Sequence, residues 1–237
     1  MEAYNKLAPY IKTLFHDSAD LIVRPLDWPE GEAILCQYSV LANQRAVNEQ
    51  IDKLSQKFQE GHSNWAESSS STLEVFHAAK LVEYVSKGET VVLFSDTNLL
   101  LRINLPSNTN RSVMEPDSEH IIQGSHDGFV ENMDINIALI RKRLSIPDLV
   151  VKKMIISQSS NSPITYMYIE SKVNQGTLDE IEYRLRKIET EYLFSTGQLA
   201  DFLEDTVWSP FPQLMTTERP DKVATNLMEG RVVLMLD

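Results

Sequence analysis

Cysteine is almost absent from this chain of 237 residues, which contains only Cys36. With a single thiol no intrachain disulfide can form, and a reducing compartment is the natural environment. Cys36 lies within an apolar run, and no histidine or lysine stands near it in the sequence to lower its pKa. We therefore interpret Cys36 as a small buried hydrophobic residue and not as a nucleophile.

Long apolar runs and an excess of basic residues are missing as well. No segment reaches the roughly 18 to 20 apolar residues that a membrane-spanning helix requires, so we expect the chain as given to be soluble. Lys and Arg number 22 against 34 Asp and Glu, which gives a formal net charge of −12. Phosphate backbones and anionic lipid headgroups repel a body of that sign. Nucleic acid is therefore not expected as a partner.

Signatures of catalysis and of metal or nucleotide binding are also missing. The sequence has no Gly-x-Ser-x-Gly elbow, His-Glu-x-x-His pair or kinase-like set. The segment Gly124–Gly128 lacks the Lys-Ser or Lys-Thr that a phosphate loop requires. His120, His126 and Asp127 are a close group of metal-type ligands, but their spacing fits no zinc pattern. We expect no enzyme, cofactor or metal, and an unrecognised hydrolase or transferase stays an alternative.

Hydrophobic periodicity predicts an α/β (α+β) protein with two α/β subdomains, each a small mixed sheet with packed helices. In the first half, Thr90–Ser95 and Leu99–Leu105 are expected to form a hairpin. Val150–Gln158 and Pro163–Glu170 predict a second hairpin in the second half. We divide the chain into an N-terminal subdomain, a connecting acidic loop and helix, and a C-terminal subdomain, at residues 1–110, 111–145 and 146–237.

Three further segments give definite expectations. Thr72 can cap a helix that begins at Leu73 and stops at Gly88. A second helix is expected to start near Asp127 and to end at Leu144. The run Arg231–Leu236 is apolar throughout, as in a strand buried on both faces. Such a strand needs covering, so we expect the chain to be the extramembrane part of a longer polypeptide with a membrane domain.

Two polar segments, Glu115–Leu144 and Trp208–Arg231, contain the candidate site residues. Asn132, Asn136 and Arg143 fall within about 40° of each other on one helix face. Amide and guanidinium groups arranged in this way can hold a carboxylate or a backbone loop. They either tie the helix to the acidic loop or contact a small molecule. The predicted ligand-binding or inter-lobe contacts are Glu115, Glu119, Asn132, Asn136, Arg143, Glu218 and Arg219.

The same two segments resemble the soluble N-terminal domain of the A subunit of bacterial spore germinant receptors, the GerA family. The resemblance covers roughly the C-terminal half, and several separated blocks occur in the right order. The matching positions are Glu115, Pro116, Glu119, Gly124, Asp127, Gly128, Phe129, Glu131, Asn132, Asn136, Arg141, Arg143, Phe211, Pro212, Thr217, Glu218, Arg219, Pro220, Asp221, Gly230 and Arg231.

This resemblance implies a non-enzymatic module of spore germination that senses or transmits the binding of a nutrient such as an amino acid or a sugar. It implies an A subunit in the inner spore membrane, with this domain on the cytoplasmic, spore-core side. The implied partners are a polytopic membrane subunit and a lipoprotein subunit, and self-association is possible in addition. The alternative from a different class is a ligand-free oligomerisation scaffold of a membrane complex.

Overall fold

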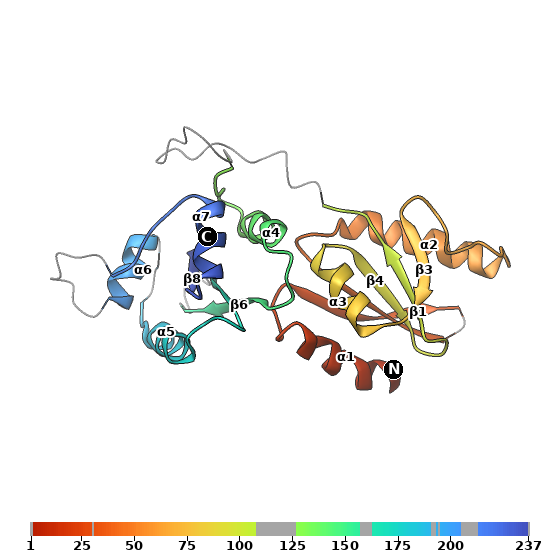
Figure 1. Cartoon of the computed structure of the whole chain (residues 1–237), viewed down its shortest axis with the longest axis horizontal. Helices are drawn as coiled ribbons and strands as arrows, with labels where there is room; N and C mark the ends of the chain where they lie inside the picture. The colour runs from red at the N-terminus through yellow and green to blue at the C-terminus, as the bar shows by residue number, and fades with distance from the viewer. Residues whose placement is uncertain are drawn as a thin grey trace. The chain divides into compact units, whose positions relative to one another are not determined.

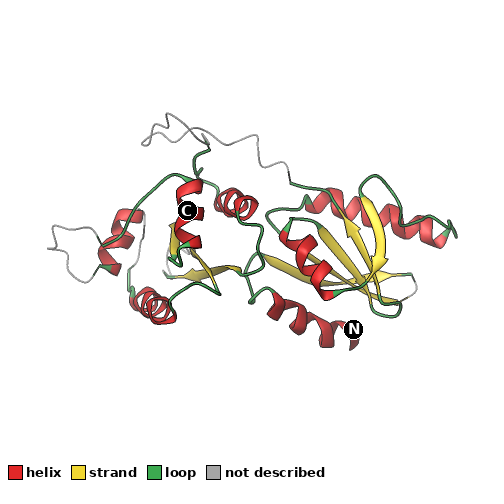
Figure 2. Cartoon of the chain, viewed as in Figure 1, coloured by secondary structure: helices red, strands yellow, loops and turns green. Residues whose placement is uncertain are grey.

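The computed structural model contains α-helices and β-sheets in both halves of the chain (Figure 1 and Figure 2). Within the described residues there are seven helices and eight strands, which confirms the predicted α+β fold class. The structure describes residues 2–29, 31–107, 127–156, 163–190, 193, 195–204 and 213–236.

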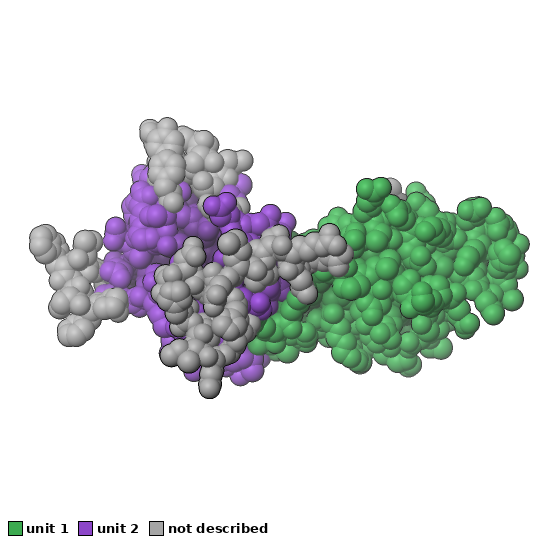
Figure 3. Space-filling view, turned by 90° about the horizontal axis from the view of Figure 1, so that it is seen from above, with its two compact units in different colours: residues 1–111, 141–148 green, residues 112–140, 149–237 purple. Residues whose placement is uncertain are grey.

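The chain divides into two compact units, which Figure 3 shows in different colours. Both units are discontinuous in sequence. Unit 1 comprises Met1–Arg111 and Arg141–Asp148, and unit 2 comprises Ser112–Ile140 and Leu149–Asp237. The predicted subdomain boundaries at residues 110 and 145 stay a prediction.

Unit 1 is built on one antiparallel sheet with the strand order β1-β2-β4-β5-β3. Helices cover both of its faces: α1 and α3 contact β1, β2 and β4 on one face, and α2 packs on the other (Figure 1). The elements are α1 (Glu2–Leu14), β1 (Leu21–Trp28), β2 (Gly31–Tyr38), α2 (Gln44–Gln59), β3 (Ser71–Val75), α3 (Ala78–Ser86), β4 (Thr90–Phe94) and β5 (Leu99–Ile103).

Alternation of side chains along the strands explains this three-layer arrangement. In β2, Ala33 and Leu35 join the cluster beneath α2, whereas Ile34 and Cys36 are fully buried on the opposite face. A strand whose successive side chains are all apolar can pack helices on both faces, because neighbours point to opposite sides. The predicted hairpin of β4 and β5 is confirmed, with Val92 paired to Leu101.

The helix expected from Leu73 to Gly88 is wrong in its first third. Residues Ser71–Val75 form β3, which pairs with β5 along its whole length, and α3 begins only at Ala78. The β-branched Thr72 and Val75 suit an edge strand. Pairing with a distant strand outweighs the local helical spacing here. α3 ends at Ser86, two residues before the predicted stop at Gly88, where φ is +87°.

Unit 2 contains a smaller antiparallel sheet with the strand order β6-β7-β8. The predicted hairpin of β6 and β7 is confirmed. We expected mixed sheets, but every pairing in the described strands is antiparallel. The elements are α4 (Met133–Arg143), β6 (Leu149–Ile155), β7 (Pro163–Ile169), α5 (Gln175–Lys187), α6 (Thr196–Leu203), α7 (Pro220–Met228) and β8 (Val233–Leu236).

The last strand differs from its prediction. β8 lies at the edge of the sheet, and only Met235 among its residues is buried, so the expectation of burial on both faces is wrong for this structure. The central strand β7 is the buried one, from Ile164 to Ile169. Its Tyr166 and Tyr168 pack with Leu178 and Leu185 of α5 in the core of unit 2.

Candidate functional site

The two polar segments that the sequence singled out meet inside unit 2. The Phe129 backbone N–H donates to the Glu218 carbonyl oxygen at 2.9 Å, so the stretch before α4 lies against the stretch before α7. Neither stretch belongs to a helix or a strand, so neither satisfies its backbone groups by regular pairing. Each therefore supplies a hydrogen-bond partner for the other.

Asn136 fixes the first of these stretches from within α4. Its Oδ1 accepts from the Val130 N–H at 2.9 Å, and its Nδ2 donates to the Val130 carbonyl at 2.6 Å. The side chain is buried, with 8% exposed. An amide that pairs with both polar groups of one residue imitates a strand partner. The Asn136 side chain is thereby committed to the protein's own backbone.

Asn132 has a different role, because it is the N-cap of α4. Its Oδ1 accepts from the Ile135 N–H at 3.0 Å, and its carbonyl accepts from the Asn136 N–H. The expected helix start near Asp127 is therefore wrong: α4 begins at Met133, after the extended stretch. Asn132 and Asn136 thus contact separate backbone groups, while the half-buried Arg143 lies at the far end of α4.

Arg219 forms a bidentate pair with Asp221 at the entry of α7. Its Nε and Nη2 donate to the two carboxylate oxygens at 3.1 and 2.6 Å. The hydrogen bond from Arg219 lowers the pKa of Asp221. Pro220 occupies the first turn between them, a position where its missing N–H costs nothing. Glu115 and Glu119, the remaining predicted site residues, lie outside the described residues, as do His120 and His126.

The most deeply buried charge belongs to Arg141, which we did not predict as a site residue. Within unit 1 its side chain is 1% exposed and pairs with the equally buried Asp20, with Nε–Oδ2 and Nη2–Oδ1 distances of 2.5 and 2.8 Å. Nη2 also donates to Ser18 Oγ at 2.9 Å, and the Ser18 hydroxyl donates to Asp20 at 2.7 Å. The guanidinium carbon lies 3.7 Å from the centre of the Tyr38 ring.

The electrostatics of this network keep Arg141 charged. Burial lowers the pKa of Arg141, but the Asp20 carboxylate raises it by more, so that the net shift is upward. Burial also raises the pKa of Tyr38, which keeps its ring neutral beneath the guanidinium. A closed, dry pair of this kind fixes geometry, because either partner alone would be an uncompensated buried charge.

A sequence signal for Arg141 existed. Arg141 follows the buried Ile137 by four residues, which places it on the same face of α4. An arginine on the apolar stripe of a helix requires a buried acidic partner. That partner, Asp20, is far away in the sequence, so its identity could not be read from local spacing.

Neither metal nor membrane features were found in the described ranges. No three residues among His, Cys, Asp and Glu come together there in a way that could hold a metal ion. None of the helices in the same ranges is both long enough and apolar enough to cross a membrane.

Comparison with known proteins gives the family. The model of the GerA family, described as Bacillus/Clostridium GerA spore germination protein, matches residues 9–237. Spore germination protein A1 of Bacillus subtilis (strain 168) is 37% identical over 160 residues, which cover 68% of this chain and 33% of that protein. The uncharacterized membrane protein YfkQ of the same organism is 31% identical over 191 residues, 81% of this chain and 36% of that protein. The chain thus spans about a third of the length of these relatives.

A solved structure shares the fold. The N-terminal domain of the A subunit of the Bacillus megaterium spore germinant receptor GerK3 superposes with a TM-score of 0.69 at 22% identity, covering 97% of this chain and 89% of that one. The family model covers nearly the whole chain, including the N-terminal half in which the motifs were weak. The predicted resemblance is confirmed, and this chain belongs to the GerA family of spore germination proteins.

Proposed function

We propose that this chain is the N-terminal domain of the A subunit of a nutrient germinant receptor. In this role it acts in spore germination by sensing or transmitting nutrient binding and by holding receptor subunits together. Family membership and the fold shared with the GerK3 A-subunit domain support the proposal. The names of the relatives, such as spore germination protein A1 and spore germination protein GerLA of Bacillus cereus, point in the same direction.

The observation that supports a role in transmitting nutrient binding is the division of α4 between the two units. Residues Met133–Ile140 belong to unit 2, and the helix continues into unit 1, where Arg141 is held by Asp20. The relay that we propose uses this covalent link between the two units.

The finer features of the role follow from the resemblance. The partners are a polytopic membrane subunit and a lipoprotein subunit, and the full-length protein resides in the inner spore membrane with this domain facing the spore core. A non-enzymatic role agrees with the chemistry of the one thiol. Cys36 is fully buried, and burial raises its pKa, so that it is not a nucleophile at neutral pH.

The proposal is tested in spores of the organism that carries this gene. Deleting the gene should slow or abolish germination with at least one class of nutrient, followed as the loss of optical density of a spore suspension. The Arg141→Met protein should reach the spore membrane in reduced amount or with a reduced response. The matched control is Arg186→Gln, which removes an exposed arginine of α5 and should leave both unchanged. Spores of the deletion strain that respond normally to every nutrient would contradict the proposal.

Exposed apolar side chains in unit 2 favour the alternative of a ligand-free oligomerisation scaffold. Tyr183, Phe202, Met215 and Met228 are 51%, 41%, 60% and 43% exposed. Apolar groups of this size gain stability when a partner covers them. Sedimentation velocity over a range of concentrations tests this role, and a chain that stays monomeric alone and with its partner subunits would exclude it.

A further inference from the structure

One strand of unit 1 carries a charge on its core-facing side. In β1, the side chains of Ile22, Arg24, Leu26 and Trp28 point towards α2. Trp28 belongs to the core cluster beneath that helix, and the partly buried Ile22 and Leu26 pack against it. Alternation along a half-buried strand predicts an apolar residue at position 24 as well. A local departure from the hydrophobic pattern is often found at a functional site.

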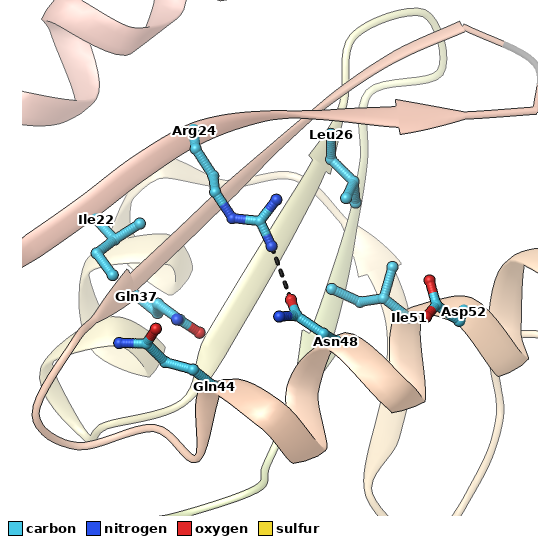
Figure 4. Close-up of a pocket in the computed structure, with 8 residues that line it drawn as sticks. All are labelled: Ile22, Arg24, Leu26, Gln37, Gln44, Asn48, Ile51 and Asp52. Atoms are coloured by element: carbon cyan, nitrogen blue, oxygen red, sulfur yellow. Dashed lines mark hydrogen bonds between the residues drawn. The ribbon is translucent and has the colours of Figure 1, made fainter.

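A cavity of about 400 Å³ lies around Arg24, between the first two strands and the N-terminal half of α2 (Figure 4). Its volume is at the lower end of the range for sites that hold small molecules. Polar and apolar side chains line it, namely Arg24, Gln37, Asn48, Ile22, Leu26 and Ile51. Figure 4 shows the guanidinium of Arg24 between the strand and Asn48, and Gln37 next to Gln44.

Gln37 contributes a buried amide with a hydrogen-bond donor to spare. The residue is only 3% exposed, and its Oε1 accepts from the Thr90 hydroxyl at 2.6 Å. Its Nε2 has no partner within the part of the chain that the structure describes. This nitrogen is not among the buried unpaired side-chain atoms of the described residues, so it is accessible to a ligand with an acceptor group.

Arg24 contributes an oriented cation. Its Nη2 donates to Asn48 Oδ1 at 2.8 Å, which holds the guanidinium above the cavity. Among the described residues Arg24 forms no ion pair, although the protein has a net charge of −12. The remaining N–H groups of the guanidinium form a planar fork that matches a carboxylate.

We propose that this cavity binds a small monocarboxylate with a short branched apolar group. The carboxylate accepts hydrogen bonds from Arg24 and from the Gln37 amide, and the apolar group contacts Ile22, Leu26 and Ile51. Asp52 lines the cavity beyond Ile51. The ligand is therefore either a simple carboxylic acid or an amino acid whose ammonium group is attracted by Asp52. The proposal goes beyond the role in germination, because binding by the purified chain does not depend on a receptor.

Three probes of similar shape test it by ligand-observed NMR on the purified chain: 3-methylbutanoate, L-valine and the neutral 3-methylbutanamide. We expect saturable binding of at least one of the two carboxylates. The neutral amide should bind about tenfold more weakly or worse, because it lacks the charge-assisted hydrogen bonds. Tighter binding of L-valine would identify the amino acid as the ligand class, and tighter binding of 3-methylbutanoate the simple acid. Absence of saturable binding of both, or equal binding of the neutral amide, would overturn the proposal.

Variants test whether the ligand binds in this cavity or elsewhere on the surface. Arg24→Gln should weaken binding of the preferred carboxylate by about tenfold, and Arg24→Lys should restore part of it, because Lys keeps the charge but not the fork. The matched control is Arg45→Gln, which removes a 91% exposed arginine of α2 that pairs with Glu49, and should bind like the parent. The melting temperature of each variant shows whether it is folded. An Arg24→Gln protein that is folded and binds with unchanged affinity would refute the assignment.

Discussion

The two units of this chain obtain their order in different ways. In unit 1 a sheet of five strands is covered on both faces, and its core contains the rings of Trp28, Phe58, Trp65 and Phe94. In unit 2 a sheet of three strands leaves more backbone without a strand partner. Side chains such as Asn136 supply those partners instead. A large sheet thus places most of its stability in apolar burial, whereas a small sheet depends on hydrogen bonds from side chains to the backbone.

The aromatic cluster shows how unit 1 achieves its packing. The Trp28 ring lies 5.7, 5.3 and 5.0 Å, centre to centre, from the rings of Phe58, Trp65 and Phe94. Each of these contacts is tilted or edge-on, the geometry in which aromatic quadrupoles attract. Trp28 ends β1 and Phe58 lies in α2, so the cluster joins the sheet to the helix at the end opposite to Arg24.

The largest expected effect concerns the buried charge pair of unit 1. Arg141→Met leaves the Asp20 carboxylate buried without its counterion, which should cost about 3 to 5 kcal/mol of unfolding free energy. Urea denaturation measures the loss, and hydrogen exchange should show it as reduced protection of β1 and β2. The double variant Asp20→Leu/Arg141→Met should recover most of the stability, because no stranded charge remains. A single variant as stable as the parent would show that the pair does not support unit 1.

The next effect concerns Asn136 of unit 2, whose side chain takes the place of a strand partner. Asn136→Ala strands the N–H and the carbonyl of Val130, which should cost about 1 to 3 kcal/mol. Hydrogen exchange should rise in residues 127–140, while β1 and β2 of unit 1 keep their protection.

Asn132→Ala provides the comparison within the same helix, because it removes only an exposed N-cap. We expect a cost of about 1 kcal/mol there. If Asn136→Ala costs less than Asn132→Ala, then the bidentate contact with Val130 is not what orders the stretch before α4.

Two glycines, each following a helix, test the comparison between unit 1 and unit 2. Gly88 after α3 and Gly230 after α7 have φ of +87° and +86°, so alanine should cost roughly 1 to 2 kcal/mol at either position. A Cβ at Gly88 would meet the Leu41 Cβ at 3.0 Å, a contact that a shift of a few tenths of an ångström relieves. A Cβ at Gly230 would meet the Lys172 carbonyl oxygen at 2.5 Å, which is fixed backbone. Thermal unfolding should therefore show a larger loss for Gly230→Ala, and equal losses would mean that the backbone of unit 2 yields as readily as a side chain.

Local patterns predicted most of the fold, and contacts between distant residues account for what they missed. The apolar runs of β4 and β5 identified their hairpin, because each run contains the whole signal of one strand. β3 was missed because its partner β5 determines its structure. The role of Asn136 as a tether was among the readings that the sequence allowed.

Arg141 and Arg24, the two arginines that only the structure singled out, show the same limit of sequence analysis. Arg141 and Asp20 are 121 residues apart in the sequence, so neither reveals its partner locally. Arg24 stands out only when its neighbours Ile22 and Leu26 are known to face the core. Both arginines were visible as departures from an apolar pattern, and the fold was needed to show that one is paired and the other faces a cavity.

The smallest effect is a dependence on pH in the core of unit 2. Burial, with the nearby Glu170 carboxylate, raises the pKa of Tyr168 from 10.0 to about 12. The folded state therefore retains the phenolic proton at pH values where the unfolded chain has lost it, so stability falls as pH rises from about 10 to about 12. Below pH 9, Tyr168→Phe should change stability little. Between pH 9 and 11 the parent should lose more unfolding free energy than Tyr168→Phe, whereas Tyr183→Phe, on the exposed side of α5, should follow the parent. Parallel pH profiles for parent and Tyr168→Phe would mean that the Tyr168 hydroxyl reaches solvent, and that the small sheet of unit 2 opens where the larger sheet stays closed.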